Sequence, residues 1–327
     1  MINKVAVFGA GVWGSVLAQH IAKQGRSVVV WEYFEHLVNK IAEHGGAHPH
    51  IPGFHFRRDI VITRDMDAAL ADADLILIVT SSKSVRRLAH DIGIRLRGKR
   101  IPVVSAAKGI EDESLLTLTE IIEQEIPAEK DCVMAFSGPS FALEVAHAMP
   151  TKIVLAGRNR RLLERTVPVF NSYPISVELS DDPTGVQWAG AAKNVLAIAC
   201  GVAEGLGKTI NTKAALVTLA MREMHDVVLA AGGTGETVYG LAGLGDFILT
   251  GTSTLSRNTR LGIKLGQGKA LAQARGEINT VTEGADSVES IYSFACAKKL
   301  NVPLINAVHD IIRKGSPAET VLHALGF

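Results

Sequence analysis

Cysteine is scarce in this sequence of 327 residues, and its three copies lie far apart. Cys132, Cys200 and Cys296 form no C-x-x-C pair. This spacing argues against a disulfide framework and favours reduced thiols, as found in the cytoplasm. We therefore expect a cytoplasmic protein.

Long apolar runs and an excess of one charge are lacking as well. Lys193 and Glu204 interrupt the most apolar stretch, so we expect no segment that spans a bilayer. The 34 Lys and Arg residues nearly balance the 33 Asp and Glu residues, which gives no general reason to bind nucleic acid or an anionic membrane. The densest basic run, 95–100, fits a solvated helix end better than a nucleic-acid patch. We expect a soluble protein that acts on a small molecule, without nucleic-acid partners or stable membrane insertion.

The order of the expected elements indicates more than one domain. Hydrophobic residues make up 47% of the chain, and its length exceeds that of most single cores. Strand-like runs alternate with helical patterns in the first half, which predicts an α/β fold with a Rossmann-type, doubly wound, parallel sheet. The expected strands are 5–8, 27–31, 60–63, 75–79, 102–105 and 133–136, with 152–156 and 175–177 at the far edge of the sheet, and the expected helices include 34–43, 65–71, 83–93, 114–124 and 159–170.

The pattern changes at Asp182, which precedes Pro183. An N-cap residue followed by proline is a good start signal for a helix, and most of the chain beyond it has helical spacing. We therefore predict a Rossmann-type domain at 1–181 and an all-α domain at 182–327.

A glycine motif near the start of the chain is typical of dinucleotide binding. Gly9, Gly11 and Gly14 fit G-x-G-x-x-G, and they lie between an apolar strand and the helical stretch 15–23. These glycines would provide a tight turn, close approach to a pyrophosphate and close packing of helix on strand. The phosphates would then lie at a helix N-terminus, where free N–H groups attract negative charge.

The residue that ends the second strand favours NAD over NADP. Glu32 lies at the distance from the glycines where an acidic side chain binds the ribose 2′-hydroxyl. A carboxylate there would also repel a 2′-phosphate, and no Lys or Arg follows closely. An exposed glutamate at a strand end is the alternative.

A lysine inside an apolar helix is the first candidate for chemistry. Lys193 follows the small residues 190–192, which would let a ligand or another backbone come close. Burial would lower its pKa into a range useful for proton transfer. The alternative, a lysine whose head reaches solvent, is equally compatible with the sequence.

Further polar residues lie where ligands often bind. Asp246 follows two glycines at the expected start of a helix, with Thr250 one turn later on the same face. Ser256, Arg257 and Asn258 resemble a helix N-terminus that holds a phosphate, although capping alone is an alternative. The segments 106–109, with Lys108, and 137–142, with Gly138 and Ser140, follow strands, where doubly wound sheets bind their ligands.

Taken in order along the chain, these motifs resemble the NAD(P)-dependent glycerol-3-phosphate dehydrogenase family. The resemblance covers essentially the whole chain and is much more specific than any single motif. It is carried by G-A-G-x-W-G, A-K-G, S-G-P-S-F-A, Pro150-Thr151, A-K-N, N-T-K-A-A-L at 211–216, G-L-G-D, S-R-N and T-E-G at 282–284. Val12 and Gly251 differ from the family pattern, but neither position carries a group with a chemical role. Residues 33–54 match the family poorly, which leaves the cofactor preference open.

The resemblance implies reversible reduction of dihydroxyacetone phosphate to sn-glycerol 3-phosphate, with Lys193 as general acid and base. It places Lys108, Asp246 and Thr250 beside Lys193 as catalytic residues, and it also implies a homodimer and a role in phospholipid synthesis. The implied substrate-binding residues are Lys108, Gly138, Ser140, Lys193, Asp246, Ser256, Arg257 and Asn258. The implied cofactor-binding residues are Gly9, Gly11, Val12, Trp13, Gly14, Glu32, Tyr33, Lys108, Ala142, Arg257, Val281 and Glu283, with NAD favoured and NADP possible.

Three other interpretations compete with this one. His44, His48, His50 and His55 crowd one loop, but their spacing fits a preorganised metal site poorly, so no metal is expected. A related reductase for another hydroxy acid would have less need of Arg257 and Asn258. A non-catalytic NAD sensor is disfavoured by the pairing of Lys193 with Asp246.

Overall fold

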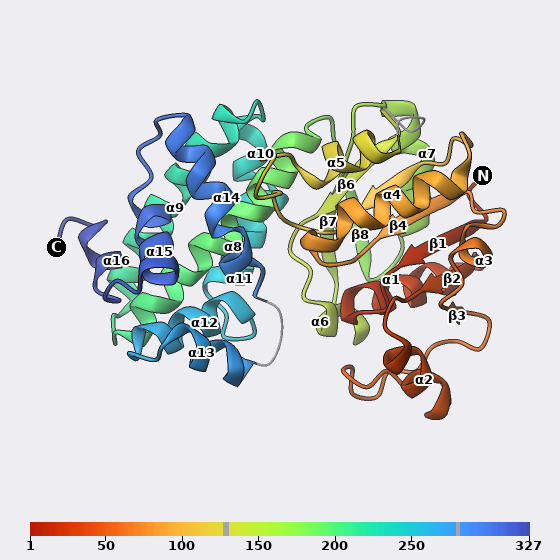
Figure 1. Ribbon diagram of the computed structural model, residues 1–327, viewed down its shortest axis with the longest axis horizontal. Coiled ribbons are helices and arrows are strands. Elements are labelled where there is room, and N and C mark those ends of the chain that lie inside the picture. The colour runs from red at the N-terminus through yellow and green to blue at the C-terminus, as the bar shows by residue number, and fades with distance from the viewer. Residues whose placement is uncertain (127–130, 279–281) are drawn as a thin grey trace. The chain divides into compact units, whose positions relative to one another are not determined.

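The computed structural model describes residues 1–126, 131–278 and 282–327, shown in Figure 1. The chain divides into two compact units, one made of residues 1–107 and 118–183 and the other of residues 108–117 and 184–327. The sequence-based boundary assigned 108–117 to the first domain, whereas this segment packs with the helical unit. Ile110 is buried in the helical core, and Ser290 Oγ donates a hydrogen bond to its carbonyl oxygen at 3.1 Å.

Unit 1 is built on one sheet of eight strands in the order β3-β2-β1-β4-β5-β6-β7-β8. Neighbouring strands are parallel except β6 and β7, which are antiparallel. The predicted α/β class and the two added strands at the far edge are confirmed. The strands are β1 Lys4–Phe8, β2 Ser27–Trp31, β3 Val61–Thr63, β4 Leu75–Ile78, β5 Val103–Ser105, β6 Val133–Ser137, β7 Thr151–Ala156 and β8 Ile175–Ser180.

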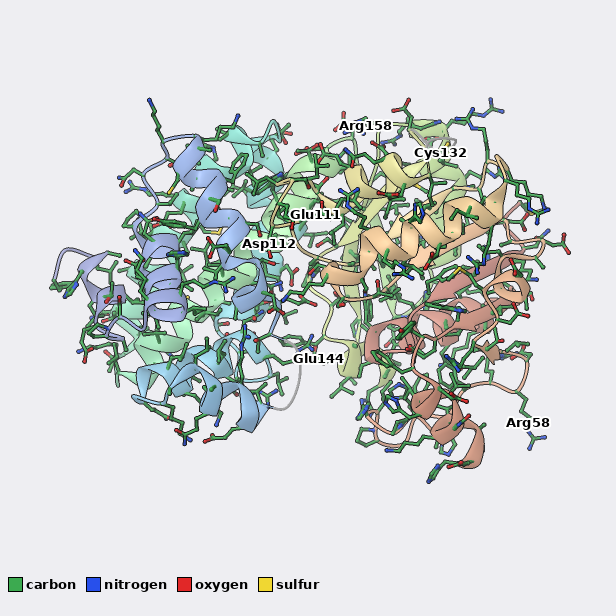
Figure 2. The ribbon with its side chains drawn as sticks, in the orientation of Figure 1. Arg58, Glu111, Asp112, Cys132, Glu144 and Arg158 are labelled. Atoms are coloured by element: carbon green, nitrogen blue, oxygen red, sulfur yellow. The ribbon has the colours of Figure 1, made fainter. Side chains whose placement is uncertain are left out.

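Helices follow most strands of unit 1, as the alternating pattern predicts. The predicted helix at 114–124 begins only at Leu118, because Ile110 and Thr117 pair as an isolated antiparallel bridge. Most apolar side chains of the sheet are buried, with Val61 of the edge strand β3 exposed, whereas charged side chains such as Arg58 point away from the ribbon (Figure 2). The helices are α1 Val12–Lys23, α2 Glu35–Glu43, α3 Met66–Leu70, α4 Val85–Leu96, α5 Leu118–Glu125, α6 Ala142–Ala146 and α7 Arg160–Phe170.

The strand order places a switch point at β1. The chain runs from β1 outward to β2 and β3 and then returns to β4 on the other side of β1. Connections that leave β1 and β4 therefore diverge, and doubly wound folds bind ligands in the crevice at the carboxyl ends of such strands. The glycine motif lies directly after β1, at this position.

In its described residues, unit 2 consists of helices joined by loops and has no strand, apart from the isolated bridge between Ile110 and Thr117. Its central helix, α8, begins at Pro183 as predicted and is long and apolar enough to cross a membrane by length and composition. Its apolar window is entirely buried in the structure, which is typical of a core helix. The helices are α8 Pro183–Gly205, α9 Ile210–Ala230, α10 Gly235–Tyr239, α11 Asp246–Gly251, α12 Arg257–Gly266, α13 Leu271–Ile278, α14 Glu283–Ala297, α15 Pro303–His309 and α16 Thr320–His323.

Glycines allow α8 and α12 to cross at backbone contact. A Cβ atom added at Gly201 would lie 2.2 Å from the Thr259 carbonyl oxygen, and one at Gly262 would lie 2.2 Å from the Ile198 carbonyl oxygen. Gly205 and Gly266 repeat the contact one turn later. Since α8 carries Lys193 and α12 begins at Arg257, this crossing sets the distance between two groups of candidate site residues.

We expect Gly201→Ala to destabilise the protein by about 2 kcal/mol, because the added methyl group must push two helices apart. Gly276 offers a matched control, since it lies exposed in α13 and a Cβ atom there would meet nothing within 4 Å. Gly276→Ala should leave stability unchanged or raise it by roughly 0.5–1 kcal/mol. Chemical denaturation of both variants measures the difference, and equal stabilities would contradict the close crossing.

Candidate active site

The glycine loop of unit 1 has the geometry of a pyrophosphate cradle. Gly9 has φ +114°, and a Cβ atom there would lie 2.6 Å from the Val79 carbonyl oxygen. A Cβ atom at Gly14 would lie 2.0 Å from the Gly9 carbonyl oxygen, so neither position admits a side chain. Gly11 faces open space, with nothing within 4 Å of its added Cβ atom. A dinucleotide pyrophosphate therefore fits here, against the unpaired N–H groups expected at the first turn of α1.

The acidic residue at the end of β2 lies against this loop. Glu32 is only 5% exposed; its Oε2 accepts a hydrogen bond from the Ala10 N–H at 2.7 Å and its Oε1 accepts one from the Phe34 N–H at 2.9 Å. The alternative of an exposed glutamate is therefore wrong. Each carboxylate oxygen has a second acceptor position, so these bonds leave capacity for a ribose hydroxyl. Tyr33, another candidate cofactor residue, is 67% exposed.

The remaining candidates of unit 1 lie on and beside the loop ends. Val12 and Trp13 begin α1 and are half-buried. Gly138 follows β6 with φ +148°, and Ser140 Oγ donates to the Gly138 carbonyl oxygen at 3.0 Å. Ala142 begins α6 and is half-buried. The structure thus places these residues at the carboxyl ends of β1 and β6.

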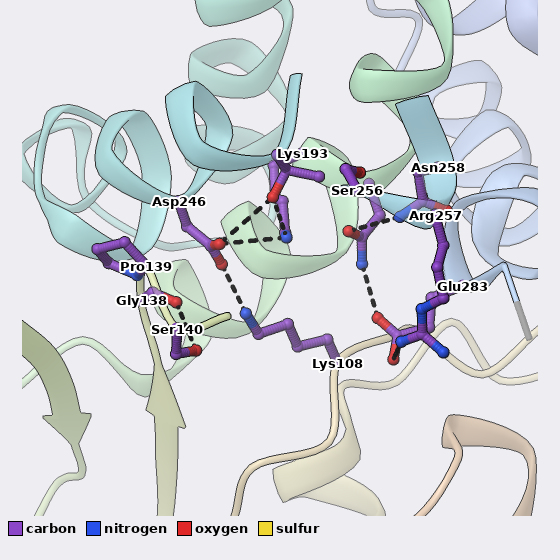
Figure 3. Close-up of polar contacts among 12 residues, drawn as sticks. Lys108, Gly138, Pro139, Ser140, Lys193, Asp246, Ser256, Arg257, Asn258 and Glu283 are labelled. Carbon is purple, nitrogen blue, oxygen red and sulfur yellow. Dashed lines mark hydrogen bonds and ion pairs between the residues drawn. The ribbon is translucent and has the colours of Figure 1, made fainter. Parts of the chain in front are cut away.

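Unit 2 brings the four predicted catalytic residues together (Figure 3). Lys193 Nζ, in the middle of α8, donates to Thr250 Oγ1 at 2.7 Å and to Asp246 Oδ1 at 3.2 Å. The other carboxylate oxygen of Asp246 accepts a hydrogen bond from Lys108 Nζ at 2.6 Å. Two ammonium groups therefore share one buried carboxylate.

Burial and charge set the protonation of this cluster. Burial, with a smaller contribution from Lys108, lowers the pKa of Lys193 to about 8 against the opposing effect of Asp246. Burial raises the pKa of Asp246, but the two lysines outweigh it and hold the pKa below its ordinary value. At neutral pH, Lys193 is therefore a protonated acid that loses its proton readily, beside a carboxylate that stays ionised.

Local sequence explains why the lysine cannot reach solvent. Its side chain is 7% exposed and lies in a helix whose neighbouring apolar residues are fully buried, so the alternative of a lysine extended to solvent is wrong. The glycines before Asp246 lie in a π-helical turn, Leu241–Gly245, continuous with α11, rather than in an open turn. A Cβ atom at Gly243 would lie 2.1 Å from the Val238 carbonyl oxygen. That glycine lets the helix start where Asp246 reaches Lys193.

A second polar network joins α8, α12 and α14. Asn194 Oδ1 accepts from Asn258 Nδ2 at 2.9 Å, and Asn194 Nδ2 donates to Glu283 Oε2 at 3.0 Å. Asn258 Oδ1 accepts from the Gly284 N–H at 3.0 Å. Arg257 lies 4.0 Å from Glu283 and keeps 46% of its side chain exposed, so its guanidinium is accessible to an anion.

The start of α12 combines capping with a potential anion site. Ser256 Oγ accepts a hydrogen bond from the Thr259 N–H at 3.2 Å, which makes it the N-cap, and the residue is 3% exposed. The expected N-cap at Ser256 is therefore present. It leaves Arg257 at the first helical position, where the helix dipole and the guanidinium both attract negative charge.

Sequence reasoning missed Asn194, which connects two groups of predicted residues. Its signal was a second polar side chain beside Lys193 in an otherwise apolar helix. The predicted cofactor residue Val281 lies outside the described residues. Within the described residues, no group of three or more His, Cys, Asp or Glu side chains could hold a metal ion.

Comparisons with known proteins give matches over nearly the whole chain. Family profiles for the N-terminus and the C-terminus of NAD-dependent glycerol-3-phosphate dehydrogenase match residues 4–163 and 182–323. A glycerol-3-phosphate dehydrogenase (NAD(P)+) from Citrifermentans bemidjiense is 37% identical, covering 99% of this chain and 97% of the relative. The crystal structure of glycerol-3-phosphate dehydrogenase from Coxiella burnetii has a TM-score of 0.94 and 32% identity, covering 100% and 99% of the two chains. A ketopantoate reductase from Ralstonia eutropha, at TM-score 0.64 and 18% identity, shares the fold alone.

Proposed function

Because the chain belongs to the NAD-dependent glycerol-3-phosphate dehydrogenase family and is an NAD(P)-dependent oxidoreductase, we propose that Lys193 transfers the proton in its reaction. The reaction interconverts sn-glycerol 3-phosphate and dihydroxyacetone phosphate. The observation that carries the proposal is the buried Lys193 ammonium, held between Asp246 and Thr250 at 3.2 and 2.7 Å.

The proton transfer follows from the charges around Lys193. A nicotinamide cofactor held at the glycine loop would supply the hydride for the carbonyl carbon or accept it from the carbinol carbon. As a ketone is reduced, negative charge develops on its oxygen, and the Lys193 ammonium stabilises that charge and then gives up a proton. Asp246 keeps the amine protonated until the charge appears, and Lys108 holds the carboxylate from its other side. In the oxidation direction, neutral Lys193 removes the proton from the hydroxyl group.

The α12 N-terminus would bind the substrate phosphate. Arg257 offers a planar pair of donors suited to phosphate oxygens, next to the N–H groups of the first helical turn. Asn194 bonds to both Asn258 and Glu283, and Asn258 accepts from the Gly284 N–H, so the start of α14 is held beside the start of α12. A substrate without a phosphate would lose these interactions.

A direct assay tests the proposal through the substrate class. The purified chain should consume NADH when dihydroxyacetone phosphate is added, as measured by the absorbance of the reduced nicotinamide. Unphosphorylated dihydroxyacetone is the matched control and should react with kcat/KM lower by a factor of about 100 or more, since charged hydrogen bonds contribute roughly 1.5–3 kcal/mol each. Equal reaction of both ketones would reject the phosphate site, and reaction of neither would reject the activity.

NAD is the proposed preferred cofactor because of Glu32. Its buried carboxylate beside the glycine loop would repel the 2′-phosphate of NADP. Glu32→Gln keeps the shape and removes the charge, so the NADH to NADPH ratio of kcat/KM should fall by about tenfold. Glu35→Gln, at an exposed position of α2, is the control. An unchanged ratio in Glu32→Gln would show that Glu32 does not select the cofactor.

We further propose a cytoplasmic homodimer that supplies glycerol phosphate for phospholipid synthesis. The scarce, separated cysteines support the compartment. The dimer and the pathway follow from the family resemblance, and sedimentation of the purified chain measures the oligomeric state.

A further inference from the structure

The loop with four histidines, residues 44–55, is a compact part of unit 1 that packs against the glycine motif. After α2, the chain turns so that Ala47 and His55 pair as an antiparallel bridge, and the His48 N–H donates to the Phe54 carbonyl oxygen at 3.1 Å. Phe54 and Phe56 contact each other and the His48 ring. His48 is 4% exposed, whereas His44, His50 and His55 lie nearer the surface.

His48 reaches from this loop to the centre of the glycine motif. Its Nε2 lies 2.9 Å from the Ala10 carbonyl oxygen, and Ser15 Oγ donates to the same oxygen at 3.0 Å. The Ala10 N–H donates to Glu32. Side chains from α1, from the end of β2 and from the histidine loop therefore hold both backbone polar groups of the residue between Gly9 and Gly11.

The partners of His48 determine which ring nitrogen carries the proton. The Ala10 carbonyl oxygen can only accept, and the His50 N–H, 3.1 Å from His48 Nδ1, can only donate. The neutral ring with the proton on Nε2 satisfies both. Burial lowers the pKa of His48, although the bond to Ala10 opposes this shift. The lowered pKa also favours the neutral ring.

We propose that His48 is a positioning residue for the cofactor: with Glu32, it fixes the Ala10 peptide and thereby the phosphate-binding loop. A glycine-rich loop has many accessible backbone conformations, and binding selects only one of them. Affinity falls in proportion to the fraction of molecules whose loop is already in that conformation. The inference rests on the proposed function only in taking this loop as the NAD(P) site.

Two amide substitutions separate this role from a role in folding the histidine loop. His48→Gln can place a donor where Nε2 lies and keep the bond to Ala10. His48→Asn is too short to reach Ala10, but its oxygen can take the place of Nδ1 and keep the bond to the His50 N–H. His55→Asn, in the same loop but with an exposed side chain, is the matched control.

The experiment measures NADH binding by fluorescence titration, with the melting temperature of each variant recorded. We expect His48→Asn to raise the Kd for NADH by about tenfold, because it loses roughly one buried hydrogen bond. The Kd values of His48→Gln and His55→Asn should stay within about threefold of the parent value. At saturating NADH and substrate, kcat should change little in all three.

The reverse order, with His48→Gln the weaker binder, would overturn the proposal and assign His48 to the loop's own turn. Equal Kd values in His48→Asn and the parent would overturn it as well. Titration needs no turnover, so a parent protein that binds NADH but reduces no dihydroxyacetone phosphate would reject the proposed function and leave this test intact.

Discussion

Lys193→Ala is expected to lower kcat for dihydroxyacetone phosphate reduction by about a thousandfold or more, because general acid catalysis and stabilisation of the developing oxyanion are lost together. Lys193 Nζ is the buried ammonium that touches both Asp246 and Thr250. NADH affinity should be retained, since the glycine loop belongs to the other unit. Initial rates at saturating substrate and an NADH titration measure the two quantities.

Lys208→Ala is the matched control for this substitution, because Lys208 lies exposed after α8. It should leave kcat, stability and NADH affinity unchanged. A folded Lys193→Ala protein that keeps more than about a tenth of the parent rate would contradict the assignment, since general acid catalysis contributes at least about a hundredfold.

Asp246→Asn is expected to reduce both activity and stability. The amide cannot balance two ammonium groups, so Lys108 and Lys193 would face each other without an anion between them. Removing one partner of a buried ion pair lowers the free energy of unfolding by about 3–5 kcal/mol, although deprotonation of Lys193 relieves part of that loss. The pKa of Lys193 should fall, which removes the proton donor at neutral pH, and we expect kcat to fall by about a hundredfold or more.

Denaturation and initial-rate measurements test the Asp246 prediction. Asp226→Asn, at an exposed position of α9 in the same unit, controls for the loss of one carboxylate and should be neutral. Wild-type stability and rate in Asp246→Asn would mean that the carboxylate does not hold the two lysines in their charged state.

Local patterns predicted the strands and most helices of unit 1. The strands carry continuous apolar runs, and Gly9 and Gly14 have steric reasons that the spacing already indicates, whereas Gly11 faces open space. The placement of Lys193 required the structure, because a buried lysine and a lysine extended to solvent have the same helical spacing.

Contacts between distant segments could not be read from the sequence. Residues 108–117 pack with the helical unit through Ile110, although they follow a strand of the sheet. His48 is 38 residues from Ala10, and the histidine loop showed no periodicity that points to the glycine motif. Such pairings depend on how the chain returns to the sheet, which no local pattern encodes.

The pH dependence of kcat/KM for dihydroxyacetone phosphate reduction, measured in the parent and in Lys193→Ala, tests the central claim most directly. Because reduction needs the protonated amine and the pKa of Lys193 is about 8, the parent value should be level below that pH and fall above it. The fall should approach about tenfold per pH unit, as for a single essential acid. In Lys193→Ala, the residual rate should lack this decline. The same decline in the variant would contradict the account, because another group would then be supplying the proton.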